Sequence, residues 1–143
     1  MFITQDIKKQ ISDLLKKMSQ RVDWLEEIKN REDDWEKDLT YVLASERALH
    51  TSVEFTTDIA SIIIDALVMR DPGSYSDILK VLVEEDVLQK EWFDSFVGIL
   101  PLRARFIRDH ANIEPLEVKD AVHQYTDAFQ PFMDTIASYI GLK

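Results

Sequence analysis

The sequence predicts an all-helical protein, and three observations point to this fold class. The chain has 3 glycines and 4 prolines in 143 residues, which leaves little material for the turns of a sheet protein. Hydrophobic residues make up 45% of the chain and charged residues 31%, as in a globular protein with one core. In several stretches the apolar residues recur at steps of three and four, the spacing of one helix face. We therefore expect one domain over residues 1–143, built as an up-and-down bundle of about five helices.

The first two helices follow from the longest of these patterns. Apolar residues mark one face of a helix over residues 4–30, with Thr4 as its N-cap. The polar stretch 31–37 is either a connection or a solvated continuation of one of the two helices beside it. A second helix over residues 38–69 carries apolar residues on two faces. Such a helix lies either at the centre of a bundle or half within a dimer interface.

The next segment begins with a turn. Asp-Pro-Gly within residues 69–75 favours a β-turn with proline at its second position and glycine at its third. Ser74 is followed three residues later by Asp77, which is typical of a capping box. The pattern predicts a short helix that ends near Glu84.

Prolines divide the remaining helices. A helix over residues 89–109 contains Pro101, which removes an amide donor and clashes with the preceding turn, so we expect a kink or break there. A last helix begins at Pro115, where proline is favoured. We expect this helix to bend at Pro131 and to stop at Gly141.

The charge and composition exclude several classes of function. A formal net charge of −10 and a pI near 4.7 are unfavourable for broad, non-specific nucleic-acid binding, which depends on basic surface. The absence of cysteine rules out disulfides and thiolate chemistry. No apolar run approaches the roughly 18 residues that span a bilayer, and residues 1–10 lack the pattern of a secretion signal. We expect a cytoplasmic protein with no membrane association.

One basic run departs from this acidic background. Residues 102–110, L-R-A-R-F-I-R-D-H, contain three arginines, an aspartate and one of the 3 histidines. If the run is helical, Arg103 and His110 lie within roughly 20° of one face, whereas Arg105 and His110 diverge by about 140°. Guanidinium groups are suited to binding phosphate or carboxylate. The alternative is a solvated arginine face that pairs with acids further along the chain: Glu114, Glu117 and Asp120.

No metal or cofactor site is expected. A two-metal site in a helical bundle needs two Glu-x-x-His pairs, and only Asp120 and His123 approach this spacing. The chain has no glycine-rich phosphate loop. His50 and Glu54 lie one turn apart in the second helix, and we expect a structural hydrogen bond between them rather than a ligand pair.

Three stretches resemble the HepT-like branch of the HEPN superfamily. They are Y-V-L-A-S-E-R-A-L-H-T-S-V-E-F-T-T-D-I-A at 41–60, R-D-P-G-S-Y at 70–75 leading into D-I-L-K-V-L at 77–82, and the basic run 102–110. The resemblance covers nearly the full chain. It implies a compact helical bundle that pairs as a homodimer and brings two copies of the Arg–His segment together. Active members resemble metal-independent endoribonucleases, toxins that are paired with a small MNT-type nucleotidyltransferase antitoxin.

The resemblance also implies roles for individual residues. The family motif is an arginine followed, after four to six residues, by a histidine, and both Arg103 and Arg105 stand in this relation to His110. In RNA cleavage a histidine can move the proton of the ribose 2′-hydroxyl, and an arginine can stabilise charge on the phosphoryl oxygens. Arg103 is then the phosphate clamp and His110 the acid–base group, with Arg105 and Arg47 as candidates for contact with RNA.

The apolar positions favour a second register of the same motif, because helical packing constrains them more tightly than a permissive motif does. If Phe106 and Ile107 align with the apolar pair that usually precedes the family histidine, Arg103 keeps the arginine position, Arg108 takes the histidine position and His110 takes that of a tyrosine. Arg108 keeps its charge and cannot move protons at neutral pH. This register predicts a catalytically degenerate dimer that acts as an RNA-binding or protein-interaction module. It also removes the tyrosine that the antitoxin adenylylates in many members.

Overall fold

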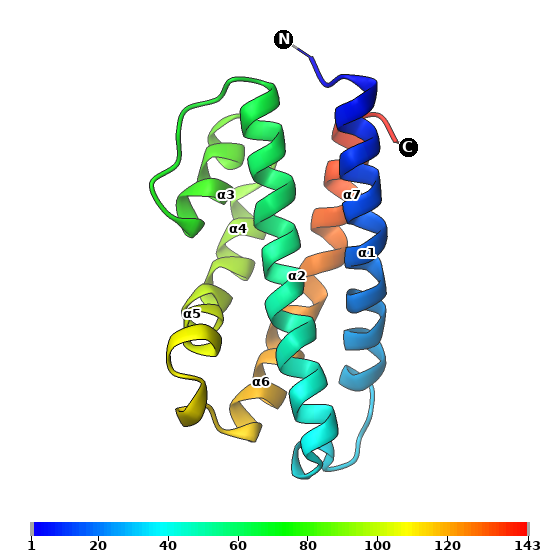
Figure 1. Cartoon of the computed structure of the whole chain (residues 1–143), viewed down its shortest axis with the longest axis vertical. Helices are drawn as coiled ribbons and strands as arrows, with labels where there is room; N and C mark the ends of the chain where they lie inside the picture. Colours follow the sequence, from blue (N-terminus) through cyan, green and yellow to red (C-terminus); the bar gives the residue numbers. More distant parts are fainter. Residues whose placement is uncertain (1, 143) are drawn as a thin grey trace.

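The computed structural model describes residues 2–142, and within this range every regular element is helical (Figure 1). The α-helices are α1 Gln5–Lys29, α2 Leu39–Ala66, α3 Tyr75–Glu84, α4 Lys90–Phe96, α5 Leu100–Arg108, α6 Pro115–Tyr125 and α7 Phe129–Tyr139. A 3₁₀ turn joins α4 end to end with α5, and another joins α6 with α7, so that these elements form five helical segments. The arrangement confirms the all-helical bundle of about five helices.

The segments run up and down around one core. In Figure 1, α1 and α2 lie side by side and antiparallel, and α7 lies behind α1, with which it packs. The α4 and α5 pair descends along the other side of α2, and α6 and α7 return to the end that holds both termini. Besides α1, helix α2 packs on α3, α5, α6 and α7. Helix α2 therefore occupies the centre of the bundle, which is one of the two placements that its apolar faces predict.

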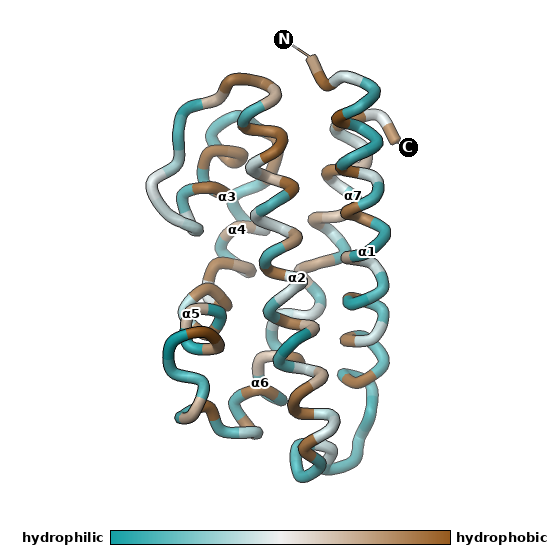
Figure 2. Tube along the Cα trace, viewed as in Figure 1, coloured by the Kyte–Doolittle hydropathy of each residue, from teal (hydrophilic) through white to brown (hydrophobic). Residues whose placement is uncertain are grey.

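The helix faces that the apolar spacing predicts are the buried ones. Thr4 caps α1 as predicted, because its hydroxyl accepts a hydrogen bond of 3.2 Å from the amide of Ile7. Figure 2 shows polar and apolar segments alternating along α1, and the apolar ones face the bundle. No helix within residues 2–142 combines the length and the apolar character needed to cross a membrane. The buried side chains of α1 are Ile11, Met18, Val22, Leu25 and Ile28.

Pro101 and Pro131 interrupt two long segments in the same way. A 3₁₀ turn at Val97–Ile99 precedes Pro101, and another at Thr126–Ala128 precedes Pro131. Proline cannot donate to the carbonyl four residues earlier, and its ring clashes with that carbonyl. The carbonyl belongs to the 3₁₀ turn in both cases, where the backbone departs from α-helical geometry. The predicted breaks are confirmed, and α5, which follows the first of them, packs against α2.

Two ends of helices differ from their predicted positions. Helix α2 ends at Ala66 rather than near residue 69, because Val68 has a left-handed backbone with φ of 52°. The amide of Met69 then bonds to the carbonyl of Ile64 at 2.9 Å, which closes the helix end. Helix α5 ends at Arg108, so the basic run is not one continuous helix.

The cap of α3 is half of the predicted capping box. The hydroxyl of Ser74 accepts a hydrogen bond of 3.2 Å from the amide of Asp77, as predicted. The carboxylate of Asp77 accepts from the amide of Gly73 at 2.8 Å instead of from Ser74. It also binds the guanidinium of Arg70 through two hydrogen bonds of 2.8 and 2.9 Å. These bonds fix the loop before α3 and therefore the position of Tyr75, the first residue of that helix.

Candidate active site

Arg103 lies where α5 meets α2. Its Nε donates a hydrogen bond of 2.6 Å to Oε1 of Glu54 on α2. The side chain of Arg103 is 18% exposed and that of Glu54 is 28% exposed, so both charges have lost much of their hydration. A paired arrangement is needed at this depth, since either charge alone would be costly to bury. The two Nη groups of Arg103 make no hydrogen bond within residues 2–142, and they remain available to an anion.

Tyr75 holds the same pair from the side of α3. Its hydroxyl donates a hydrogen bond of 2.8 Å to Oε2 of Glu54, the second oxygen of that carboxylate. The guanidinium carbon of Arg103 lies 3.7 Å from the centre of the Tyr75 ring, which is a close cation–π contact. Arg103 is thus held by a bond at Nε and by the aromatic ring. Three helices contribute to its position.

The contacts of Glu54 set its charge state. Burial raises the pKa of the Glu54 carboxyl, but hydrogen bonds from Arg103 and Tyr75 act against burial and bring the pKa below its ordinary value. Burial and the bond to Glu54 raise the pKa of the Tyr75 hydroxyl. At neutral pH the group is therefore a carboxylate held by a protonated phenol and a guanidinium.

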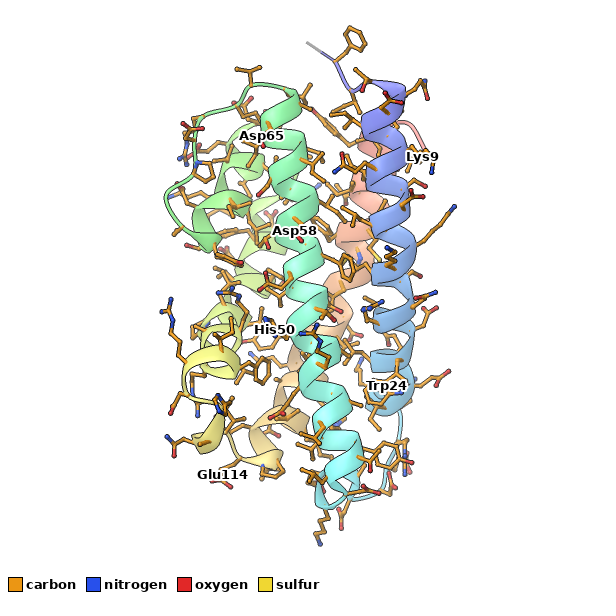
Figure 3. All side chains as sticks on the ribbon, in the orientation of Figure 1. Lys9, Trp24, His50, Asp58, Asp65 and Glu114 are labelled. Carbon is orange, nitrogen blue, oxygen red and sulfur yellow. The ribbon has the colours of Figure 1, made fainter. Side chains whose placement is uncertain are left out.

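A hollow of about 170 Å³ opens beside this cluster. His50 lies at its edge on α2, and Figure 3 shows this residue at the level of α5. Nε2 of His50 is 3.4 Å from Oε1 of Glu54, so the two side chains are in contact, but they do not make the hydrogen bond that the sequence predicts. The ring of Phe106 lies 6.2 Å from the imidazole. The residues that line the hollow are Leu43, Glu46, Arg47, His50, Phe106 and His110.

His110 reaches the hollow by a different route from the one predicted. A helix through residue 110 would place His110 near the face of Arg103, but Asp109 has φ of −140° and ends α5. His110 begins the 3₁₀ turn His110–Asn112. It still lines the same hollow as His50, and its charge lowers the pKa of Glu46, which burial raises by a larger amount.

The other arginines of the run are placed differently from Arg103. Arg105 donates from Nη1 to Oε2 of Glu117 at 2.6 Å and from Nη2 to the carbonyl of Asn112 at 3.2 Å. This bonding matches the predicted alternative of an arginine paired with acids, and it ties α5 to the start of α6. Arg108 is exposed and makes no ion pair within residues 2–142. Arg47 is exposed and likewise forms no ion pair in this part of the chain, but it lines the hollow.

The acidic and histidine side chains do not form a metal-binding group. Among residues 2–142, no three of them are placed to hold one ion together. The spacing of Asp120 and His123 therefore has no third ligand in the described structure. The chemistry available at the site is that of guanidinium, imidazole, phenol and carboxylate groups.

The sequence matches one described protein family. The family described as ribonuclease HepT-like matches residues 7–136. The chain belongs to this HepT-like family. A related protein, YutE of Bacillus subtilis (strain 168), bears a name that assigns it provisionally as an RNase. YutE is 30% identical over 107 residues, which are 75% of this chain and 74% of YutE.

Solved structures share the fold of this HepT-like protein. A structure described as that of YutE from Bacillus subtilis, a cytosolic protein of unknown function, matches with a TM-score of 0.84 and 25% identity. The match covers 99% of this chain and 94% of that one. A crystal structure described as a toxin-antitoxin with AMP-PNP matches with a TM-score of 0.78 and 19% identity, over 93% of this chain and 99% of that one. This second likeness is one of fold. The resemblance to the HepT-like branch is confirmed.

Two residues of the site, Glu54 and Tyr75, lie outside the basic run, and the run does not identify them. Glu54 is 49 positions from Arg103 in sequence, and its spacing predicts a contact with His50 but gives no sign of Arg103. An acidic side chain among the buried residues of α2 is the signal that identifies it, because such a group needs a cationic partner. Tyr75 belongs to the family stretch 70–75, but sequence spacing gives no measure of its distance from Glu54.

Proposed function

We propose that this HepT-like protein is an endoribonuclease that works without a metal ion, with Arg103 as the phosphate clamp and His110 as an acid–base group. Membership of a family described as ribonuclease HepT-like supports RNA as the substrate. The observation that carries the proposal is the position of Arg103. Its Nε is bound to Glu54 and its guanidinium packs on the ring of Tyr75, so the orientation of its two Nη groups is fixed.

The residue types fit the chemistry of RNA cleavage. The 2′-oxygen of ribose attacks the neighbouring phosphorus and displaces the 5′-oxygen, which gives a 2′,3′-cyclic phosphate and a 5′-hydroxyl. A guanidinium that is already oriented stabilises the charge that builds on the phosphoryl oxygens. An imidazole can carry the proton, because it titrates near neutral pH.

We propose that the protein acts as a homodimer in the cytoplasm, paired with an MNT-type nucleotidyltransferase antitoxin. Leu43 lines the hollow and is 54% exposed, and Ile107, next to Phe106, is 48% exposed. Apolar side chains exposed beside the site are suited to cover by a second copy. The fold neighbour described as a toxin-antitoxin supports the partner class.

Endonuclease assays in EDTA test this function. We expect cleavage of single-stranded RNA by the wild-type protein and loss of at least about 100-fold in rate for Arg103→Ala and His110→Ala. His123→Ala is the matched control, because His123 is an exposed histidine on α6 that lies outside the hollow. Unchanged cleavage in both site variants, or dependence on a divalent ion, would overturn the proposal.

A non-catalytic dimer that binds RNA or protein is the second candidate. Arg108 stands in the histidine position of one motif register, and Arg105 is already neutralised by Glu117. Arg108→His separates the two functions. A large gain of cleavage over an inactive wild-type protein favours the degenerate module, whereas active wild-type protein that is indifferent to this change favours the ribonuclease.

A further inference from the structure

We infer that His50 is the second proton-transfer group of the proposed ribonuclease, and that it acts with His110 across the hollow of a single chain. The inference rests on the proposed function and adds a catalytic residue to it. In the motif register that places Arg108 at the family histidine position, His50 supplies from α2 the imidazole that α5 then lacks.

Two of the 3 histidines, His50 and His110, line the hollow, and they come from elements far apart in sequence. His50 lies in the middle of α2, and His110 begins the 3₁₀ turn after α5. Arg47 lines the same hollow and forms no ion pair within residues 2–142, so its guanidinium can meet an anion there. A volume of about 170 Å³ holds a phosphodiester group and its immediate substituents. The lining is thus two imidazoles, one cation and one half-buried acid around a space of the right size.

The surroundings of His50 orient its ring. Nε2 lies 3.4 Å from a carboxylate oxygen of Glu54, and that carboxylate is held in place by Arg103 and Tyr75 at 2.6 and 2.8 Å. With a proton on Nε2 facing Glu54, the lone pair of the neutral ring is on Nδ1. Phe106 packs beside the imidazole and limits its rotation. The side chain of His50 is 21% exposed, so it is accessible to a ligand as well as supported.

The reaction balances with these two groups alone. The neutral imidazole accepts the proton of the ribose 2′-hydroxyl as the 2′-oxygen bonds to phosphorus. The protonated imidazole donates its proton to the 5′-oxygen as the bond from phosphorus to that oxygen breaks. One proton has entered the pair and one has left, so exchange with water restores the starting state. Separate base and acid groups raise the rate further than one histidine can, since each is in the correct form at the start.

The charged groups around the two imidazoles are balanced. Glu46 and Arg47 line the hollow with them, and Glu54, which lies 3.4 Å from His50, is bound to Arg103 outside the lining. Two carboxyl groups and two guanidinium groups are therefore in the lining or next to it. A pH profile of cleavage reports the protonation of the two histidines directly if the carboxyl groups keep one protonation state between about pH 5 and pH 8.

Kinetics of His50→Gln test the role of His50. We expect kcat to fall at least about 100-fold with little change in KM, and the bell-shaped pH profile of kcat to lose one limb. Glutamine keeps the length and polarity of the side chain but cannot carry the proton. If His50 has only a structural role, the substitution will lower the stability of the protein and leave the shape of the pH profile unchanged. Wild-type kcat and a complete bell in His50→Gln, with activity lost in His110→Ala, would overturn this inference and leave the proposed function standing.

A binding measurement on the wild-type protein gives an independent readout. The chain has 3 histidines, so their imidazole resonances can be followed by NMR as 3′-AMP is added. We expect the resonances of His50 and His110 to move together, while His123 serves as the internal control. Movement of His110 alone would exclude His50 from the site. No movement of either histidine would count against both the inference and the proposed function.

Mixed dimers decide whether one chain supplies both groups. A mixture of His50→Gln and His110→Ala subunits has no chain with both imidazoles, so we expect no recovery of cleavage. Recovery to a substantial fraction of wild-type activity would show that the two histidines act across a subunit boundary, and it would overturn the single-chain arrangement.

Discussion

Nε of Arg103 lies 2.6 Å from Oε1 of Glu54, and this bond joins α5 to the central helix α2. Both side chains are less than one-third exposed. Glu54→Ala leaves the guanidinium without its partner, and we expect the free energy of unfolding to fall by about 1–3 kcal/mol. Urea denaturation measures the change. Asp13→Ala is the control, because the pair of Lys9 and Asp13 is largely exposed and its loss should have little effect.

The contribution of Glu54 depends on pH in a definite direction. Burial raises the pKa of this carboxyl, but the donors Arg103 and Tyr75 more than offset it, so the folded-state pKa lies below the ordinary value of 4.5. A carboxyl with a depressed folded-state pKa stabilises the fold fully above its unfolded-state pKa and loses that effect as pH falls through the folded-state pKa. The stability difference between wild type and Glu54→Gln should therefore be constant near pH 7 and shrink below about pH 4.5. A difference that grows on acidification would contradict this assignment.

Val68 carries strain that a single substitution can remove. Its φ of 52° is in the left-handed region, which costs a β-branched residue about 1–2 kcal/mol, and its side chain is 71% exposed. Val68→Gly removes that cost, although glycine makes the unfolded chain more flexible by roughly 0.5–1 kcal/mol. We expect a net gain of about 1 kcal/mol in the free energy of unfolding. Val68→Ala keeps a Cβ atom and should gain much less, which chemical denaturation of the three proteins will show.

Gly98 is exposed, and the Tyr125 side chain lies against it. A Cβ atom at this position would come 2.5 Å from the hydroxyl oxygen of Tyr125. We expect Gly98→Ala to lower the free energy of unfolding by about 1–3 kcal/mol. Tyr125→Phe in the same chain should restore most of the loss, because the next nearest atom of the ring is 3.4 Å away. Equal stability of the single and double variants would show that the clash is relieved elsewhere.

The local rules of sequence account for most of the fold. The apolar spacing of α1 and α2, the cap at Thr4, and the breaks before Pro101 and Pro131 depend on residues within a few positions of one another. The end of α2 is different, because Val68 adopts a backbone conformation that its residue type disfavours. Backbone hydrogen bonds at the helix end, such as that from Met69 to Ile64, outweigh this preference, and no sequence pattern predicts them.

The site was predictable only in part, because its contacts are between distant segments. The basic run identifies Arg103 and His110, but it gives neither Glu54 nor Tyr75 as partners of the arginine. The helical spacing of Arg103 and His110 is also not the reason that both face α2. Asp109 ends α5, and a 3₁₀ turn brings His110 to the hollow. Distance in space is set by how α3 and α5 pack on α2, which the spacing of residues along one helix does not encode.

Arg47 should contribute more than Arg105 to RNA affinity. Both are candidates for RNA contact, but Arg105 is bound to Glu117 at 2.6 Å, whereas Arg47 lines the hollow and has no ion-pair partner within residues 2–142. A guanidinium that already binds a carboxylate brings little net charge to a phosphate, since the acid stays beside it.

For single-stranded RNA each phosphate contact contributes about 0.7 to the slope of log affinity against log salt concentration. We therefore expect Arg47→Ala to lower this slope by about 0.7 and Arg105→Ala to change it little, as measured by fluorescence anisotropy over a salt series. A larger loss of slope for Arg105→Ala would mean that Arg105 leaves Glu117 to bind RNA, and the double variant with Glu117→Gln would then show the same slope as Arg105→Ala alone.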